Sequence, residues 1–287
     1  MFKKLFCLLA VLAIAGSANA ALIAYYDFDV LLDPTHVKNM GTAGSAADGL
    51  LVNGAMVIDI DTTARGVEWA LQLNNTTGSG LADSQYMNIT NGTDTWYDTA
   101  IPLTLGARSY AAWVRQNTNT TATWNVIASK GFETAVNLAT GTPAGLGADQ
   151  VVFSHQTGFA SWAPLKGTVS ARDDVKWIHV IATINGVDYK TGSLYINGVL
   201  QDSRQTWGGL YQNDLDLLIG AEPNRTGYQF GWNGMIDDVR IYDSAIDQQG
   251  ATDLFVNTYS AARPTIPEPA TIALLGLGGL ALLRRKR

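Results

Sequence analysis

The sequence predicts an all-β fold in which two antiparallel sheets form a sandwich. Short apolar segments recur along the 287-residue chain, and clusters of turn-forming residues separate them. Aspartate, which favours turns and caps, outnumbers glutamate, which favours helices, by 21 to 4. One stretch near the end of the body has a helical pattern. Many strands with almost no helix favour a sandwich.

The expected strands follow one another along the body of the chain. They are Leu22–Asp29, Trp69–Asn74, Tyr86–Thr90, Arg108–Arg115, Trp124–Lys130, Gln150–Gln156, Trp177–Asn185, Gly192–Asn197, Asp216–Gly220 and Gly234–Tyr242. In the segment 177–184 neither alternating face is clearly polar, which predicts a central strand whose second face is covered or lines a concave surface. The stretch 134–148 is rich in Gly, Ala and Thr and is expected to be a long loop.

Two local signals predict a turn and a helix start. Asn197-Gly198 lies between two apolar segments and predicts a type I′ hairpin, because both turn residues need a positive φ. Asp247 is placed to cap the expected helix, with Leu254 and Phe255 facing inward.

The first 20 residues have the pattern of a secretory signal peptide. Two lysines precede an apolar stretch, and Ala18-Asn19-Ala20 forms a small-x-small cleavage site, so we expect cleavage after Ala20. Cys7, the single cysteine, leaves with this segment. The mature chain then has no thiol and no disulfide, and its stability must come from core burial or from a metal.

The C-terminal segment 263–287 has three parts in order. Pro267-Glu268-Pro269 comes first, the apolar run 270–283 follows, and Arg284-Arg285-Lys286-Arg287 closes the chain. As a helix the run would span about 21 Å, short of a hydrocarbon core of about 30 Å. The basic cluster nevertheless favours a short transmembrane helix with its C-terminus inside. We expect this helix to anchor the chain in the inner membrane transiently.

This three-part tail resembles the PEP-CTERM sorting signal of Gram-negative bacteria. The resemblance implies recognition by an exosortase, cleavage near Pro267-Glu268-Pro269, and release or attachment at the cell surface. Proteins with this signal commonly accompany exopolysaccharide production. An ordinary short membrane anchor is the alternative, and it would have the same topology.

Residues 21–262 are expected to form one domain, because no charged or Pro-rich linker divides them. Six of the 19 basic residues lie at the two ends of the chain, in 1–20 and 284–287, so the part between them has 13 basic and 25 acidic residues, a net charge of −12. An acidic body argues against nucleic-acid binding, since phosphate would be repelled.

Several motifs, taken in order, resemble the laminin G-like, concanavalin A-type jelly roll of secreted bacterial proteins. They are Tyr25–Asp29, Ala70–Leu73, Ala112–Arg115, Trp177–Val180, Gly192–Gly198, Leu218–Gly220 and Gly234–Tyr242. Glu68 stands where the family usually has glycine, a departure that concerns the local turn. The resemblance implies two antiparallel sheets and often a structural calcium. It implies no single activity, since the fold serves lectins, adhesins and hydrolases.

The expected calcium site lies between the first and the final strand. Asp237 and Asp238 are adjacent, so they should point to opposite faces. Asp237 shares parity with the apolar residues that follow it and should face the core, where a lone carboxylate must be neutralised. The resemblance implies that Asp237 binds Ca²⁺ together with backbone carbonyls near Asp27 and Gly66, since calcium prefers oxygen ligands. Hydrogen bonding of Asp237 to backbone amides or a buried arginine is the alternative.

The sequence offers little material for catalysis. Glycoside hydrolysis needs two carboxylates about 5–10 Å apart. Asp214 and Asp216 are the nearest candidates, and a solvent-facing pair is the alternative. His36, His155 and His179 lack zinc-site spacing, and His179 is expected to be structural. The chain has no Gly-x-Ser-x-Gly elbow and no phosphate-binding loop motif. We therefore expect no catalytic residues.

The tryptophans fall into two groups. One group lies in predicted strands and is expected to pack in the core: Trp69, Trp113 and Trp177. The other stands in loop contexts beside Pro or Gly: Trp162, Trp207 and Trp232. Binding residues collect on loop tips and sugar faces stack on aromatic rings, so the second group is predicted to bind ligand. Capping of the core under long loops is the alternative.

Together these features predict a non-catalytic binding or matrix protein at the cell surface, with carbohydrate or protein as its ligand. An exosortase is the expected processing partner, Ca²⁺ the expected structural ion, and a link to exopolysaccharide the expected context. Two alternatives stay open, namely a polysaccharide-active hydrolase of the same fold and a structural surface protein without a ligand.

Overall fold

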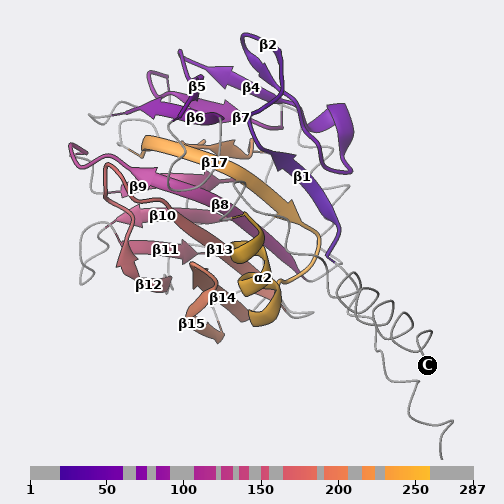
Figure 1. Ribbon diagram of the computed structural model, residues 1–287, viewed down its shortest axis with the longest axis vertical. Helices are drawn as coiled ribbons and strands as arrows, with labels where there is room; N and C mark the ends of the chain where they lie inside the picture. The colour runs from indigo at the N-terminus through magenta and orange to yellow at the C-terminus, as the bar shows by residue number, and fades with distance from the viewer. Residues whose placement is uncertain are drawn as a thin grey trace, which may run out of the picture.

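Two antiparallel sheets packed face to face build the protein, so the predicted all-β sandwich is confirmed (Figure 1). The computed structural model describes residues 20–60, 69–75, 82–90, 107–120, 124–131, 136–141, 150–154, 164–185, 191–205, 215–223 and 230–258.

The first sheet is eight-stranded and has β17 near its middle. Its order is β15 (Val199–Gln205), β14 (Thr191–Ile196), β13 (Ile178–Asn185), β8 (Arg108–Gln116), β17 (Asn233–Tyr242), β6 (Trp69–Asn74) and β5 (Met56–Asp59). The eighth strand, β1 (Leu22–Tyr26), also pairs with β17. The first half of β17 pairs with β6 and its second half pairs with β1, so these two strands meet end to end beside it.

The second sheet is nine-stranded. Its order is β12 (Leu165–Ser170), β11 (Gln150–Ser154), β10 (Asn137–Gly141), β9 (Trp124–Ser129), β16 (Leu218–Ile219), β7 (Tyr86–Asn88), β4 (Gly49–Val52), β3 (His36–Val37) and β2 (Leu31–Asp33). A short 3-10 helix, η1 (Gly44–Ala47), precedes β4.

The main core lies between the sheets and takes side chains from both. A second apolar cluster lies on the outer face of the first sheet, where helix α2 (Gln248–Thr258) covers β8, β13 and β14 (Figure 1). Because one face of β13 points into the main core and the other lies under α2, every residue from Ile178 to Ile184 is buried. The prediction of a central strand here is confirmed.

The predicted turn and helix cap are also present. Asn197 and Gly198 have φ values of 51° and 75° and connect β14 to β15. The Oδ1 of Asp247 accepts a hydrogen bond from the backbone N of Gly250 at 2.8 Å. Gln248 donates through Nε2 to the carbonyl of Gly198 at 2.6 Å, which fastens the start of α2 to the hairpin turn.

One predicted loop is wrong in part. Within the stretch 134–148, residues Asn137–Gly141 form strand β10, which pairs with β9 on one side and β11 on the other. All five of its residues are buried. Small residues weaken the local strand signal, but two neighbouring strands supply the missing order through backbone hydrogen bonds.

Candidate ligand-binding site

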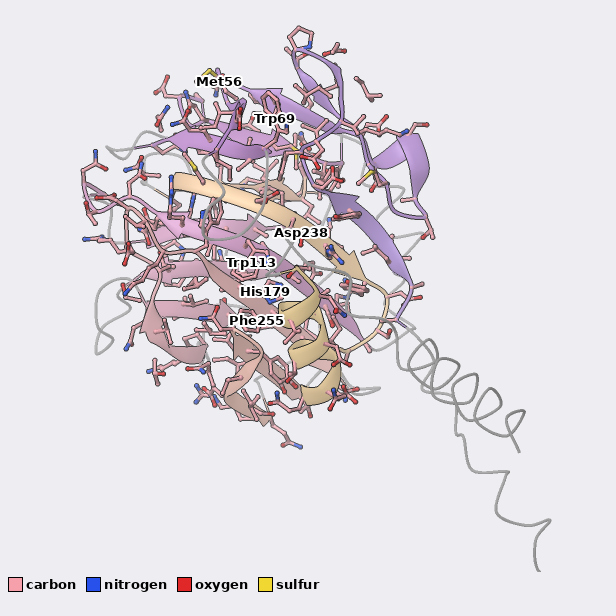
Figure 2. All side chains as sticks on the ribbon, in the orientation of Figure 1. Met56, Trp69, Trp113, His179, Asp238 and Phe255 are labelled. Atoms are coloured by element: carbon pink, nitrogen blue, oxygen red, sulfur yellow. The ribbon has the colours of Figure 1, made fainter. Side chains whose placement is uncertain are left out.

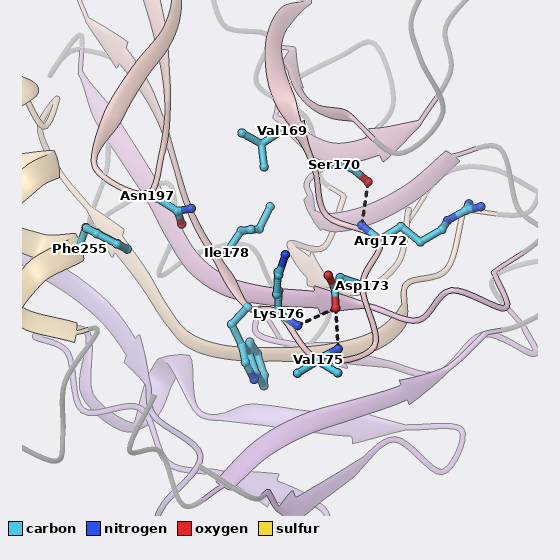
Figure 3. Close-up of a pocket in the computed structure, with 10 residues that line it drawn as sticks. Val169, Ser170, Arg172, Asp173, Val175, Lys176, Ile178, Asn197 and Phe255 are labelled. Atoms are coloured by element: carbon cyan, nitrogen blue, oxygen red, sulfur yellow. Dashed lines mark hydrogen bonds between the residues drawn. The ribbon is translucent and has the colours of Figure 1, made fainter. Parts of the chain in front are cut away.

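A pocket of about 610 Å³ opens where the β12–β13 connection, the β14–β15 turn and helix α2 meet (Figure 3). It is lined by Val169, Ser170, Arg172, Asp173, Val175, Lys176, Trp177, Ile178, Asn197 and Phe255. Apolar and aromatic walls with a few polar groups are typical of sites that bind small molecules.

Hydrogen bonds of Asp173 hold the connection 171–177 in place. The backbone N of Asp173 donates to the carbonyl of Gln116 at 2.9 Å, which ties the connection to the end of β8. The Oδ1 of Asp173 accepts hydrogen bonds from the backbone N of Val175 and of Lys176, both at 2.8 Å. These bonds lower the pKa of Asp173, so the carboxylate is charged at neutral pH and is committed to the loop.

The next residue fixes the same connection to a neighbouring turn. Asp174 accepts hydrogen bonds from the hydroxyl and from the backbone N of Thr118, the latter at 2.8 Å. Both bonds lower the pKa of Asp174. The floor of the pocket is therefore built on a fixed loop, which favours a preformed site.

Trp177 forms one wall of the pocket and is half-buried. The guanidinium carbon of Arg115 lies 5.4 Å from the centroid of its ring. The Nη2 of Arg115 donates to the sulfur of Met235 at 3.0 Å, and a thioether is a weak acceptor. Burial lowers the pKa of Arg115, yet an arginine stays charged in proteins. Among the residues that the structure describes, no carboxylate forms an ion pair with Arg115.

The opposite wall comes from the hairpin turn and from α2. Asn197 accepts a hydrogen bond through Oδ1 from the backbone N of His179 at 2.9 Å, which leaves its Nδ2 donor for the pocket. The Phe255 ring lies 6.2 Å from the His179 ring and 5.6 Å from the Trp113 ring, measured between centroids. Figure 3 shows Asn197 and Phe255 on one side of the pocket and Lys176 extending into it beside Ile178.

A row of side chains crosses the outer face of the first sheet and leads to this pocket. Met56 pairs with Gln72, Gln72 with Met235, and Met235 with Arg115, so all four lie on one face. Arg115 then stacks on Trp177. None of the four is fully buried, so the row gives the pocket an extended approach along the sheet.

Comparison with known families decides what kind of protein carries this site. Residues 81–251 match the concanavalin A-like lectin/glucanases superfamily, in its laminin G form. The chain belongs to this superfamily. Residues 265–287 of this concanavalin A-like protein match the PEP-CTERM protein-sorting motif. Both resemblances predicted from the sequence are confirmed.

Solved structures show the same fold at low sequence identity. The binding domain of botulinum neurotoxin DC in complex with rat synaptotagmin II superposes with a TM-score of 0.58 at 14% identity, covering 83% of this chain and 52% of that one. The binding domain of Paraclostridial Mosquitocidal Protein 1 gives 0.55 at 13%, covering 82% and 52%. The concanavalin A-like chain thus spans about half the length of these toxin domains.

A third structure matches over nearly its whole length. Domain 4 of AbnA, a GH43 extracellular arabinanase from Geobacillus stearothermophilus solved in complex with arabinotriose, has a TM-score of 0.50 at 18% identity. The match covers 82% of this chain and 98% of that domain. No curated protein matches the chain in sequence.

The PEP-CTERM motif implies export, exosortase processing and sorting to the cell surface. Its predicted cleavage and anchor residues Pro267, Glu268, Pro269, Arg284 and Arg285, with the run 270–283, lie outside the described residues, and Ala20 is the first residue inside them. In the part of the chain that the structure describes, no helix has the length and apolar character needed to cross a membrane.

The tryptophans of the concanavalin A-like domain are sorted differently from the prediction. Trp232, expected in a binding loop, is fully buried in the main core just before β17, so it cannot stack on a sugar. Trp162 and Trp207 lie outside the described residues. Trp113 is buried as predicted, whereas the same prediction is wrong for Trp69, which is 37% exposed. Trp177, expected in the core, instead lines the pocket, because β13 begins one residue later.

Trp177 and Lys176 are thus the binding candidates that the sequence interpretation missed. A signal was available in the sequence, because Asp173-Asp174 comes just before these residues. Aspartates favour turns, so Lys176 and Trp177 could have been assigned to the turn that precedes the strand.

The parity argument for Asp237 is also corrected. Asp238 has a φ of 53° and forms a bulge, so the pairing of β17 with β8 shifts between Asp237 and Arg240. Asp237 pairs with Trp113 and therefore lies on the outer face of the sheet, not on the face of Val239. It is nevertheless buried, and its Oδ1 accepts a hydrogen bond from the backbone N of Asp238 at 2.6 Å.

Asp238 is buried as well and is paired with Arg240, whose Nη2 lies 2.8 Å from its Oδ1. Burial raises the pKa of Asp27, and the negative charge of Asp238 adds to this, whereas hydrogen bonds from backbone N–H groups oppose it. Gly66 lies outside the described residues. Within the described part of the chain, no three His, Cys, Asp or Glu side chains gather as a metal site would require.

Of the two aspartates considered for hydrolysis, the structure describes Asp216, which does not line the pocket. Asp216 accepts a hydrogen bond from Nδ2 of Asn88 and another from the hydroxyl of Thr90, both at 2.8 Å, and so has a structural role between β7 and β16. Asp214 lies outside the described residues. Glu222 is buried and accepts a hydrogen bond from Asn137 at 2.9 Å.

Proposed function

We propose that this chain is an exported, non-catalytic carbohydrate-binding protein and that the pocket beside Trp177 holds the sugar. The observation that carries the proposal is the placement of Trp177, a half-exposed aromatic ring on a fixed loop at the mouth of a pocket. Sugar faces stack on such rings, and Asn197 and Lys176 supply donors for hydroxyl groups. The row from Met56 to Arg115 gives a polymer a path across the sheet.

A binding role accounts for the site better than hydrolysis does. Among the residues lining the pocket, Asp173 is the one carboxylate, and it is committed to backbone hydrogen bonds, whereas glycoside hydrolysis uses two. The fold is compatible with sugar binding, since the similar arabinanase domain was solved with arabinotriose. We further propose that exosortase processing delivers the protein to a surface rich in exopolysaccharide.

Replacing Trp177 with alanine should weaken polysaccharide binding by about tenfold or more, since buried aromatic anchors contribute about 2 kcal/mol or more to an interface. Affinity electrophoresis against a panel of neutral and acidic polysaccharides, including arabinan, measures the effect. Trp69→Ala is the matched control, because Trp69 is 37% exposed and lies on β6, away from the pocket. Wild-type binding to no polysaccharide, or equal binding by Trp177→Ala, would contradict the proposal.

We also propose a structural calcium held by the carboxylate of Asp237 with backbone oxygens near Asp27 and Gly66. The support is the position of the buried Asp237 carboxylate, which lies in β17 at the point where β6 gives way to β1, beside the strand end that precedes Asp27. Bound calcium would stabilise the folded state alone.

A chelator should therefore lower the melting temperature, and added calcium should restore it. The expected loss is about 2.7 kcal/mol if the ion is present at a hundred times its dissociation constant. Asp237→Asn should abolish the response, whereas Asp33→Asn, at an exposed carboxylate of β2, should retain it. A wild-type melting curve that does not move with the chelator would exclude the site.

A further inference from the structure

The pocket contains an exposed cation that is not fixed in an ion pair within the described part of the chain. Lys176 is exposed and lines the pocket, and Figure 3 shows its side chain extending inward while that of Arg172 points away. None of the ion pairs among the described residues involves Lys176. The neighbouring Asp173 carboxylate attracts the ammonium, but its hydrogen bonds come from two backbone N–H groups and leave the ammonium able to donate to a ligand.

A second cation, Arg115, lies behind the same wall. Arg115 stacks on Trp177, and its Nε is buried without a hydrogen-bond partner. Within the described part of the chain, Arg115 donates a hydrogen bond to the Met235 sulfur. Asp173 and Asp174 attract these cations, but no carboxylate of the described residues forms a close ion pair with either one, and both cations lie beside one aromatic ring.

We infer that the pocket selects a carboxylate-bearing sugar, as in a uronic acid polymer, with Lys176 as the counter-charge; this inference rests on the proposed function. The sugar ring would lie against Trp177 and Phe255, its carboxylate would accept from Lys176 Nζ, and a hydroxyl would accept from Asn197 Nδ2. Hydrogen bonds between charged partners are about twice as strong as neutral ones.

Charge also explains why a neutral sugar would fit less well. A neutral ring in this pocket would remove water from the Lys176 ammonium without supplying an anion, and such desolvation is unfavourable. The acidic remainder of the protein repels a polyanion, so attraction is confined to this pocket and to the Arg115 side of it. Added salt should weaken the contact with Lys176, because the ammonium is exposed.

The test compares polygalacturonate with its methyl ester, which has the same backbone without the charge, on the full-length mature protein by isothermal titration calorimetry. Wild type should bind the acid about tenfold more tightly than the ester. Lys176→Gln should lose this preference and bind the acid and the ester with similar affinity. Lys38→Gln, at an exposed lysine next to β3 in the other sheet, should behave as wild type.

Two other probes separate this inference from the proposed function. Poly-L-glutamate has carboxylates without sugar rings, and binding as tight as that of polygalacturonate would overturn the assignment to a sugar. Equal affinity of wild type for acid and ester would overturn the charge selection while leaving carbohydrate binding intact. Binding of arabinan, but of neither polygalacturonate nor its methyl ester, would also overturn the charge selection and leave carbohydrate binding intact. Binding of no polysaccharide would overturn the proposed function as well.

Discussion

Replacing Trp113 with alanine should lower the free energy of unfolding by about 3–5 kcal/mol, the range for removing a large buried aromatic side chain. Trp113 has no exposed surface, and its ring centroid lies 5.0 Å from that of His179 and 5.6 Å from that of Phe255 (Figure 2). Its Nε1 donates to the hydroxyl of Thr258 at 2.7 Å, at the end of α2. The substitution therefore leaves a cavity and also removes a polar contact that holds the helix.

Urea unfolding of the mature protein measures the loss, and amide hydrogen exchange tests whether α2 opens first. Trp69→Ala is the control of the same residue type, and with Trp69 37% exposed its loss should be well below that of Trp113→Ala. Phe255→Ala should share the faster exchange of α2, because Phe255 packs on Trp113 from the helix. If both tryptophan variants lose the same stability, the packing of α2 on Trp113 is not what stabilises this face.

Local sequence signals were sufficient where the structure depends on neighbours in the chain. Asn197-Gly198 predicts its turn because both residues must adopt a positive φ, and they do. Asp247 predicts the start of α2 because its side chain can reach an amide three residues later, and it does. The segment 177–184 predicts a central strand because neither face is clearly polar, and both faces of residues 178–184 are covered.

Pairing between distant strands decided what the local signals could not. The bulge at Asp238 inserts one residue into β17, and one extra residue inverts the alternation of all that follow. The parity of Asp237 with Val239 therefore predicts the wrong face, although each residue is assigned to the right strand. Nothing in the local sequence requires a bulge, since its position depends on where β6 ends and β1 begins.

The candidate site was mispredicted for a related reason. Trp177 and Trp232 both stand next to the first residue of a strand, yet one lines a pocket and the other has no exposed surface. The exposure of each tryptophan depends on which other parts of the fold pack over the start of its strand. Trp232 lies in the main core between the sheets, whereas Trp177 lies at an edge of the face that α2 covers. The composition and spacing of the sequence do not show which elements pack over each tryptophan.

Replacing Arg240 with methionine should lower the free energy of unfolding by about 3–5 kcal/mol, because it leaves a buried carboxylate without its partner. Arg240 donates through Nε and Nη2 to one oxygen of Asp238, at 3.1 Å and 2.8 Å. Its guanidinium lies 4.3 Å from the centroid of the Tyr25 ring. Asp238 is 6% exposed, so water cannot replace the lost charge. Burial together with the nearby Asp238 carboxylate also raises the pKa of the Tyr25 hydroxyl.

The double variant Asp238→Asn/Arg240→Met separates charge from packing. Asparagine tolerates the left-handed backbone that Asp238 adopts at φ 53°, so the bulge is kept while the charge is removed. Most of the stability lost in Arg240→Met should therefore return, as measured by urea unfolding at neutral pH. A double variant as unstable as the single one would mean that the stacking of Arg240 on Tyr25, and not the ion pair, holds β1 against β17.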